Sequence, residues 1–103
     1  MYNPDNIPDC WKIVELTNVQ TGESHKRVLC SWLGGYLDGG SWKLSSGNMS
    51  VEDHGDHYIV PQHSGSVYKL YKTRERVSGL MENFFNSFER KPQDVVTMTW
   101  STL

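Results

Sequence analysis

Short runs of β-branched, aromatic and other apolar residues alternate with turn residues along most of the chain. The segments CWKIVELT (10–17) and KRVLCSWL (26–33) are separated by a Gly-containing turn, and this arrangement predicts a β-hairpin. Further short runs bounded by Gly, Pro, Asp or Ser predict additional strands. These strands are expected at residues 42–44, 49–52, 57–61 and 66–72.

The hydrophobic period changes after Thr73. Apolar residues then recur at intervals of three and four, which predicts one amphipathic helix over about 77–90. Its apolar face consists of Val77, Leu80, Met81, Phe84, Phe85 and Phe88. Ser78 is a suitable N-cap, and Pro92 ends the helix. We expect this face, including Phe84 and Phe88, to be buried against the sheet.

Period-2 alternation over 95–100 predicts a last strand with an apolar face and a mainly threonine face. Residues 95–100 carry no charge. An exposed edge at this strand is therefore expected to pair with another protomer in a homo-oligomer.

Most consecutive strands are joined by hairpin connections, and strands do not alternate with helices as they do in a parallel sheet. The predicted fold class is α+β, mostly β: a small antiparallel sheet or partly open barrel of about 5–6 strands with one amphipathic helix near the C-terminus. Residues 1–9 are expected to form an irregular leader, and residues 10–103 a single domain.

Composition narrows the classes of partner and location. The formal net charge is −2, whereas nucleic-acid binding depends on clustered Lys and Arg, so no nucleic-acid partner is expected. No apolar run approaches the ~18 residues that span a bilayer, so no membrane association is expected and the predicted location is cytoplasmic. Thiols stay reduced there, and Cys10 and Cys30 are expected as small buried core residues, a disulfide being the alternative if their strands pair.

The segment EDHGDHYIVPQH (52–63) comes nearest to a metal site. Its candidate ligands are Asp53, His54, Asp56, His57 and His63. The spacing matches neither HExxH nor CxxC nor a helical i, i+4 pair, so no metal and no cofactor is expected. The chain also lacks a G-x-S-x-G elbow, a Walker motif and a Rossmann glycine pattern, so no catalytic residues are assigned and the protein is not expected to be an enzyme.

The stretch SWLGGYLDGGSW (31–42) places aromatic rings around two Gly-Gly pairs. One interpretation is that Trp32, Tyr36 and Trp42 line a pocket and stack on a flat ligand such as a nucleobase. The other is that Trp32 and Trp42 are cross-strand partners that close the core over a glycine-rich hairpin. Tyr36, which has Gly on one side and Leu on the other, is the ring we expect to be exposed.

Ser64-Gly65-Ser66 resembles part of a phosphate nest, in which successive N–H groups converge on an anion. Lysines near the aromatic rings and near this turn could neutralise a phosphate. The candidate ligand-binding residues are therefore Trp32, Tyr36, Trp42, Lys43, Ser64, Ser66 and Lys69.

The same stretches carry a family resemblance. SWLGGYLDGGSWKLSSG (31–47), EDHGDHYIV (52–60) and SGSVYKLYK (64–72) resemble a group of small, uncharacterised proteins of tailed bacteriophages and some bacterial genomes. Their shared pattern is similar to W-x-G-G-Y-L-x-G-x-S-W-x-x-x-S-G, followed by an acidic turn and S-G-S-V-Y.

The resemblance implies a viral accessory protein in the host cytoplasm that works by binding, not catalysis. Counter-defence by sequestering a small nucleotide-like ligand fits that role. The alternative is a protein-interaction module that inhibits or adapts a host protein through an exposed edge strand.

Overall fold

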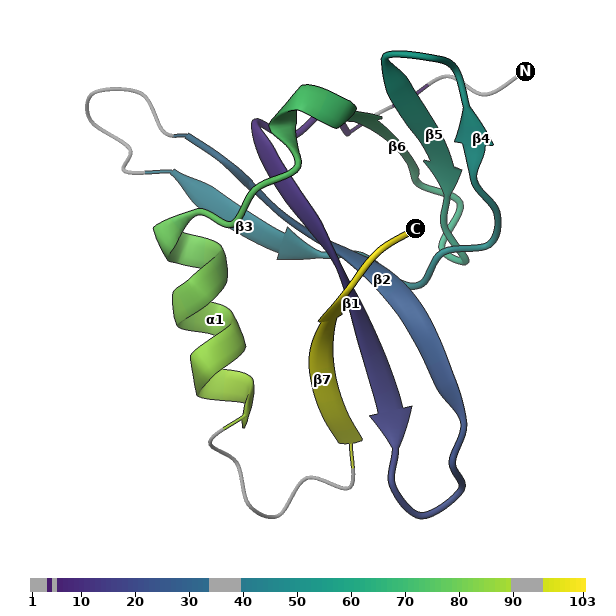
Figure 1. The fold of residues 1–103 in the computed structure, drawn as a ribbon, viewed down its shortest axis with the longest axis vertical. Coiled ribbons are helices and arrows are strands. Elements are labelled where there is room, and N and C mark those ends of the chain that lie inside the picture. The colour runs from purple at the N-terminus through teal and green to yellow at the C-terminus, as the bar shows by residue number, and fades with distance from the viewer. Residues whose placement is uncertain (1–3, 5, 34–39, 90–95) are drawn as a thin grey trace.

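The structure, a computed structural model, describes residues 4, 6–33, 40–89 and 96–103. In this part of the chain, seven strands form two antiparallel sheets, and one α-helix accompanies them (Figure 1). The strands are β1 (Cys10–Asn18), β2 (Ser24–Trp32), β3 (Ser41–Leu44), β4 (Glu52–Asp53), β5 (His57–Pro61), β6 (Val67–Tyr71) and β7 (Val96–Ser101). A 3-10 turn, η1 (Lys72–Arg74), and the helix α1 (Gly79–Glu89) lie between β6 and β7.

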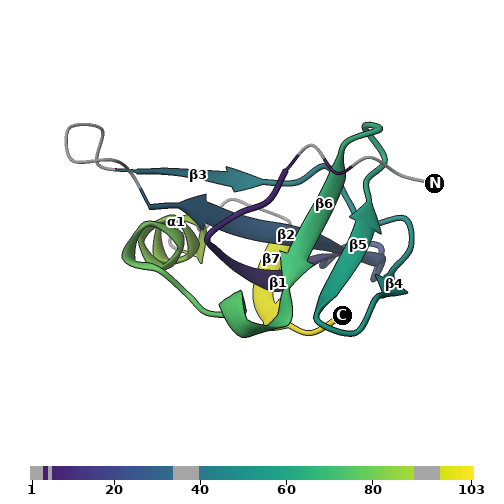
Figure 2. The same ribbon diagram turned by 90° about the horizontal axis from the view of Figure 1, so that it is seen from above.

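The hairpin that the sequence pattern predicted is present as β1 and β2, and it forms the centre of the molecule. It belongs to a four-stranded sheet of order β3-β2-β1-β7, while β4, β5 and β6 form the second sheet. Figures 1 and 2 show α1 and the three-stranded sheet on opposite sides of this hairpin. Both faces of β1 and of the second half of β2 are therefore covered, which explains why Ile13-Val14 and Val28-Leu29-Cys30 are consecutive buried apolar residues instead of alternating ones.

Successive side chains of β1 enter two different cores. Cys10, Val14 and Leu16 face the helix, while Trp11 and Ile13 face the three-stranded sheet. The helix-side core also contains Leu29, Met81, Phe85 and Met98. The core between the sheets also contains Val28, Cys30, Val60, Tyr68 and Leu70.

The helix is confirmed near its predicted position, and Ser78 acts as its N-cap by accepting a hydrogen bond of 3.4 Å from the Met81 N–H. The expected burial of Phe84 and Phe88 is wrong, because both are only partly buried. Met81 and Phe85 are the residues that enter the core.

Two tryptophans from opposite edge strands hold the helix. Phe84 stacks on Trp42 of β3 with ring centroids 4.2 Å apart, and Phe85 stacks on Trp100 of β7 at the same separation. The helix therefore lies across one face of the sheet, with a stacked aromatic pair on each side.

The predicted class, mostly β with one helix near the C-terminus, is confirmed. The strands number seven in the described residues and form two packed sheets of four and three, so the expectation of a single sheet or partly open barrel of 5–6 strands needs correction. Alternation of apolar and polar residues indicates which face of a strand is buried, but it does not indicate which strands belong to the same sheet. Within the described residues, no helix is both long enough and apolar enough to cross a membrane.

Both cysteines are buried and free, as expected for small core residues. Their strands pair, but Cys10 lies opposite Ser31 and Cys30 lies opposite Trp11, so the two thiols are on opposite faces of the sheet. Burial raises the pKa of the Cys30 thiol to about 12, although nearby Lys43 acts in the opposite direction. Cys30 is therefore a protonated, unreactive core residue at neutral pH.

Candidate functional site

The two tryptophans of the glycine-rich stretch do not share a face of the sheet. In the β2–β3 pair, Trp32 lies opposite Ser41 and Trp42 lies opposite Ser31. Because directly paired residues point to the same side, this register places Trp32 toward the core between the sheets and Trp42 toward the helix. They form neither one stacking wall nor a cross-strand pair.

Lys43, the candidate residue that directly follows this stretch, lies on the same face of the sheet as Trp32. Its ammonium lies 5.9 Å from the centroid of the Tyr68 ring, on the same face as Trp32 and Cys30. Tyr36, the residue expected to be exposed, lies outside the described residues.

The Ser64-Gly65-Ser66 turn uses its N–H groups within the protein. Ser64 donates to Ser46 Oγ at 2.9 Å, Gly65 donates to the Gln62 carbonyl at 3.0 Å, and Ser66 donates to Ser64 Oγ at 3.4 Å. A phosphate would have to displace these acceptors. The turn therefore joins β5 to β6 and does not present a preformed nest.

Lys69 also points away from the other candidates. Its neighbours in the strand, Tyr68 and Leu70, enter the core between the sheets, so Lys69 is on the outer face of β6. Its ammonium lies 4.9 Å from the centroid of the Tyr71 ring. The described candidate residues thus occupy several surfaces and do not converge on one ligand.

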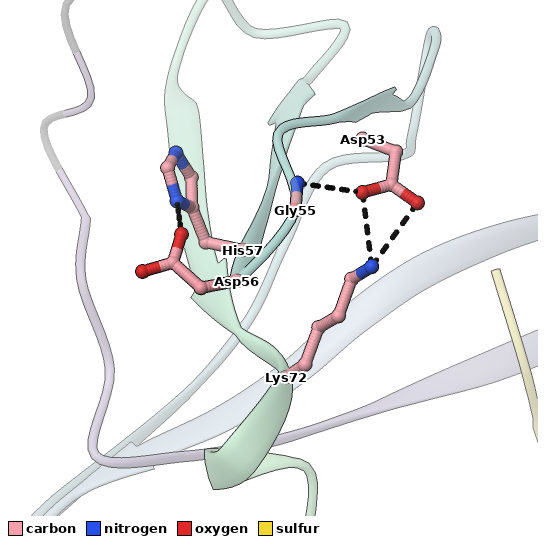
Figure 3. Close-up of polar contacts among 5 residues, drawn as sticks. All are labelled: Asp53, Gly55, Asp56, His57 and Lys72. Carbon is pink, nitrogen blue, oxygen red and sulfur yellow. Dashed lines mark hydrogen bonds and ion pairs between the residues drawn. The ribbon is translucent and has the colours of Figure 1, made fainter.

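The His- and Asp-containing turn between β4 and β5 is held by its own side chains (Figure 3). Asp53 accepts hydrogen bonds from the Gly55 N–H at 2.9 Å and from Lys72 Nζ at 3.1 Å, and these bonds lower its pKa, with the Gly55 bond having the larger effect. The bond to Asp53 also raises the pKa of Lys72. His57 Nδ1 lies 2.5 Å from Asp56 Oδ1, and this hydrogen bond lowers the pKa of Asp56.

The His54 and His57 rings in this turn stack in parallel with centroids 5.2 Å apart. Among the residues that the structure describes, no three His, Cys, Asp or Glu side chains are arranged to hold a metal ion. The hydrogen bonds of Asp53, Asp56 and His57 instead show that these side chains stabilise the turn between β4 and β5.

A hollow that the sequence did not indicate lies where three separate segments meet. Its volume is about 280 Å³. The lining residues are His25 and Lys26 of β2, Asn48, Met49, Ser50 and Val51 of the segment before β4, and Leu103 after β7. Met49 and Val51 are exposed apolar side chains, at 62% and 43% of their surface. An apolar hollow with a few polar groups is the usual form of a small-molecule site.

Buried Gln62 determines which polar group Asn48 has left to offer. The Gly47 backbone N–H can only donate, and it donates to Gln62 Oε1 at 3.1 Å. Gln62 Nε2 must then be the donor to Asn48 Oδ1 at 2.8 Å. Asn48 consequently keeps its Nδ2 amide group, which is buried and has no hydrogen-bond partner in the described part of the protein.

Lys26 gives the hollow its positive charge, whereas the neighbouring His25 is neutral. Lys26 Nζ donates a hydrogen bond of 2.5 Å to the Thr102 carbonyl, so its ammonium is held beside the C-terminal residues. His25 Nε2 accepts a hydrogen bond of 2.9 Å from Arg27 Nε, which requires the neutral form of the His25 ring at this nitrogen. The hollow is thus lined by apolar side chains, one fixed cation and Asn48, whose buried Nδ2 donor is unused among the described residues.

We expect protonation of His25 to destabilise the protein. Burial lowers its pKa below the ordinary value of 6.5, and the nearby Arg27 and His63 lower it further. The unfolded chain therefore binds a proton more readily, so stability is fully present above 6.5 and falls as the pH drops through 6.5 toward the folded-state pKa. The loss should be less than about 1 kcal/mol, because the side chain is exposed and solvent screens its interactions.

Urea denaturation at about pH 7.5 and about pH 5.5 measures this change in the free energy of unfolding. Gln in place of His25 keeps an acceptor for Arg27 but does not titrate. An equal acid-dependent loss in His25→Gln would assign the effect to other groups.

The sequence held only weak signs of this hollow. His25-Lys26-Arg27 is the densest basic group, but such a group is usually a solvated strand face. The exposed Met49 and Val51 occur in a stretch that otherwise resembles a strand. Nothing local in the sequence shows that these segments meet Leu103.

Comparisons with protein-family models, with curated proteins and with solved structures found no match to this chain. The assignment of a function therefore depends on the geometry of the chain itself.

Proposed function

We propose that this protein is a non-catalytic binding protein that holds a small anionic ligand with an apolar or flat body in the hollow beside Lys26. The observation that carries the proposal is that Asn48 lines this hollow and that its buried Nδ2 has no hydrogen-bond partner among the described residues. A buried donor left unpaired costs about 1–3 kcal/mol. A ligand acceptor atom would recover that cost once the Asn48 side chain turns to expose Nδ2, which is buried in this structure.

The remaining walls suggest the rest of the ligand. Lys26 supplies a positive charge for an anionic group, and Met49, Val51 and Leu103 supply apolar contact for a ring or a short carbon chain. A nucleotide has these features, so the expected nucleotide-like ligand is retained with a different set of contact residues. The viral accessory role and counter-defence stay predictions from the resemblance.

The first test is native mass spectrometry of the protein purified from cells. A bound small molecule should add mass to the 11.8 kDa chain. Titration calorimetry with adenosine 5′-monophosphate and with inorganic phosphate then separates the two halves of the proposed ligand. We expect the nucleotide to bind and phosphate alone to bind at least ~10-fold more weakly, which corresponds to about 1.4 kcal/mol.

Asn48→Asp is the decisive variant. It keeps an oxygen for Gln62 but replaces the unused donor with a negatively charged acceptor, so binding of the nucleotide should weaken by ~10-fold or more. Asn83→Asp introduces the same change on an exposed face of α1 and should leave binding unchanged.

A second pair of variants tests the hollow itself. Val51→Trp should fill it and abolish binding, whereas Val19→Trp places the same ring in the exposed β1–β2 turn. The proposal fails if no small molecule co-purifies and the nucleotide does not bind. It also fails if Asn48→Asp and Val51→Trp bind as tightly as their controls.

A further inference from the structure

The edges of the two sheets are protected unequally. At one edge of the three-stranded sheet, β4 consists of the two acidic residues Glu52 and Asp53. At the other, β6 is covered by the N-terminal segment, because Asn6 N–H donates to the Val67 carbonyl and Lys69 N–H donates to the Asn6 carbonyl. In the four-stranded sheet, β3 is a short edge that carries Lys43. Charge, shortness and cover are the usual means of preventing edge-to-edge pairing.

The remaining edge, β7, has none of these protections from the residues that the structure describes. It is six residues long, VTMTWS, with no charged residue and no proline. It pairs with β1 on one side, and no described residue pairs with its other side. Thr97 and Thr99 are exposed on one face of this strand, and Trp100 retains 36% of its surface on the other.

We propose that β7 pairs with β7 of a second copy of this chain, antiparallel and around a two-fold axis, so that the four-stranded sheet continues across both copies. This goes beyond ligand binding in the hollow, since it assigns a separate surface and a separate partner.

The chemistry of the strand favours its own copy as the partner. Two identical strands place equal charges near one another, which is destabilising, and an uncharged strand avoids this repulsion. A two-fold axis through a directly opposed pair, at Met98 or at Thr99, keeps odd residues opposite odd and even opposite even. Threonines then meet threonines on one face.

The other face of such a pair covers exposed apolar surface. Met98 or Val96 of the second copy would lie opposite Trp100, whose ring already stacks on Phe85 at the edge of the sheet. The two α1 helices would lie on one face of the continuous sheet and the two three-stranded sheets on the other, because the axis is perpendicular to the sheet.

Sedimentation equilibrium over a wide range of protein concentration tests the proposal. The wild-type mass should rise from 11.8 kDa toward twice that value. Thr99→Lys should remain a monomer at every concentration, since the two lysines would lie opposite or diagonal to each other in either register. Val19→Lys adds the same charge to an exposed position away from β7 and should dimerise like the wild type.

Hydrogen exchange of the unmodified protein gives a second measurement that does not depend on a variant folding. Amides within 96–101 should gain protection as the concentration rises, while those of β3 should not. A wild-type monomer at all concentrations would overturn the proposal, as would dimers of Thr99→Lys as stable as those of Val19→Lys. A monomer that instead binds a foreign extended peptide along β7 would also overturn it, in favour of the host-protein alternative.

Discussion

Replacing Trp11 with Ala should lower the free energy of unfolding by about 3–5 kcal/mol. Trp11 is 1% exposed and lies between the two sheets. Its Nε1 donates a hydrogen bond of 2.7 Å to the Tyr71 carbonyl, and its ring meets Tyr58 edge-on with centroids 6.1 Å apart. The truncation would remove a large ring and the bond that connects β1 to the end of β6.

Thermal and urea denaturation measure this loss, and the melting temperature should fall by about 15 °C or more. A domain of this size has a total stability of only about 5–15 kcal/mol, so much of the protein could be unfolded at physiological temperature. Trp11→Phe retains a ring but loses the bond to Tyr71, and its stability should lie between those of the parent and Trp11→Ala.

Trp42→Ala is the matched control, because it deletes the same side chain at a site that is 45% exposed. Trp42 loses only its stacking on Phe84 and part of its burial, so we expect a cost of about 1–2 kcal/mol. Equal losses in Trp11→Ala and Trp42→Ala would show that the region between the sheets is not the principal core.

The elements of this fold could be predicted from the sequence because their signals are local. The period of three and four after Thr73 identified α1, and the Gly-containing turn after β1 identified the hairpin. The division into two sheets could not be predicted, since alternation along β5 and β6 is the same whether they extend the first sheet or pack on it.

The ligand site depended on spatial relations that no local pattern contains. Trp32 and Trp42 resemble partners because they are close in sequence and flank glycines. A register that pairs Trp32 with Ser41 separates them onto opposite faces, and a shift of one residue would have reversed this result. The hollow beside Lys26 was missed because its walls come from β2, the segment before β4 and the C-terminal residues.

Gln62 shows the same limit at a single residue. In the sequence it is a polar residue next to Pro61, typical of the end of a strand. In the structure it is 1% exposed, and its side chain accepts a hydrogen bond from the Gly47 N–H and donates to Asn48 Oδ1 and to the Val60 carbonyl.

Gln62→Met should therefore lower the free energy of unfolding by about 3 kcal/mol, since it keeps a similar volume but leaves buried polar groups unpaired. The Gly47 N–H loses its acceptor, and the Asn48 and Val60 oxygens lose a donor. Urea denaturation measures the change, and Gln20→Met in the exposed β1–β2 turn makes the same substitution where the side chain forms none of these bonds.

The same variant connects the fold to the proposed site. Without Gln62, the hydrogen bond that fixes the orientation of the Asn48 amide is lost, so nucleotide binding should weaken even under conditions where the variant remains folded. Calorimetry at a temperature well below the melting point of Gln62→Met separates this effect from unfolding. A folded variant that binds the nucleotide as tightly as Gln20→Met would show that the orientation of Asn48 does not matter for the ligand.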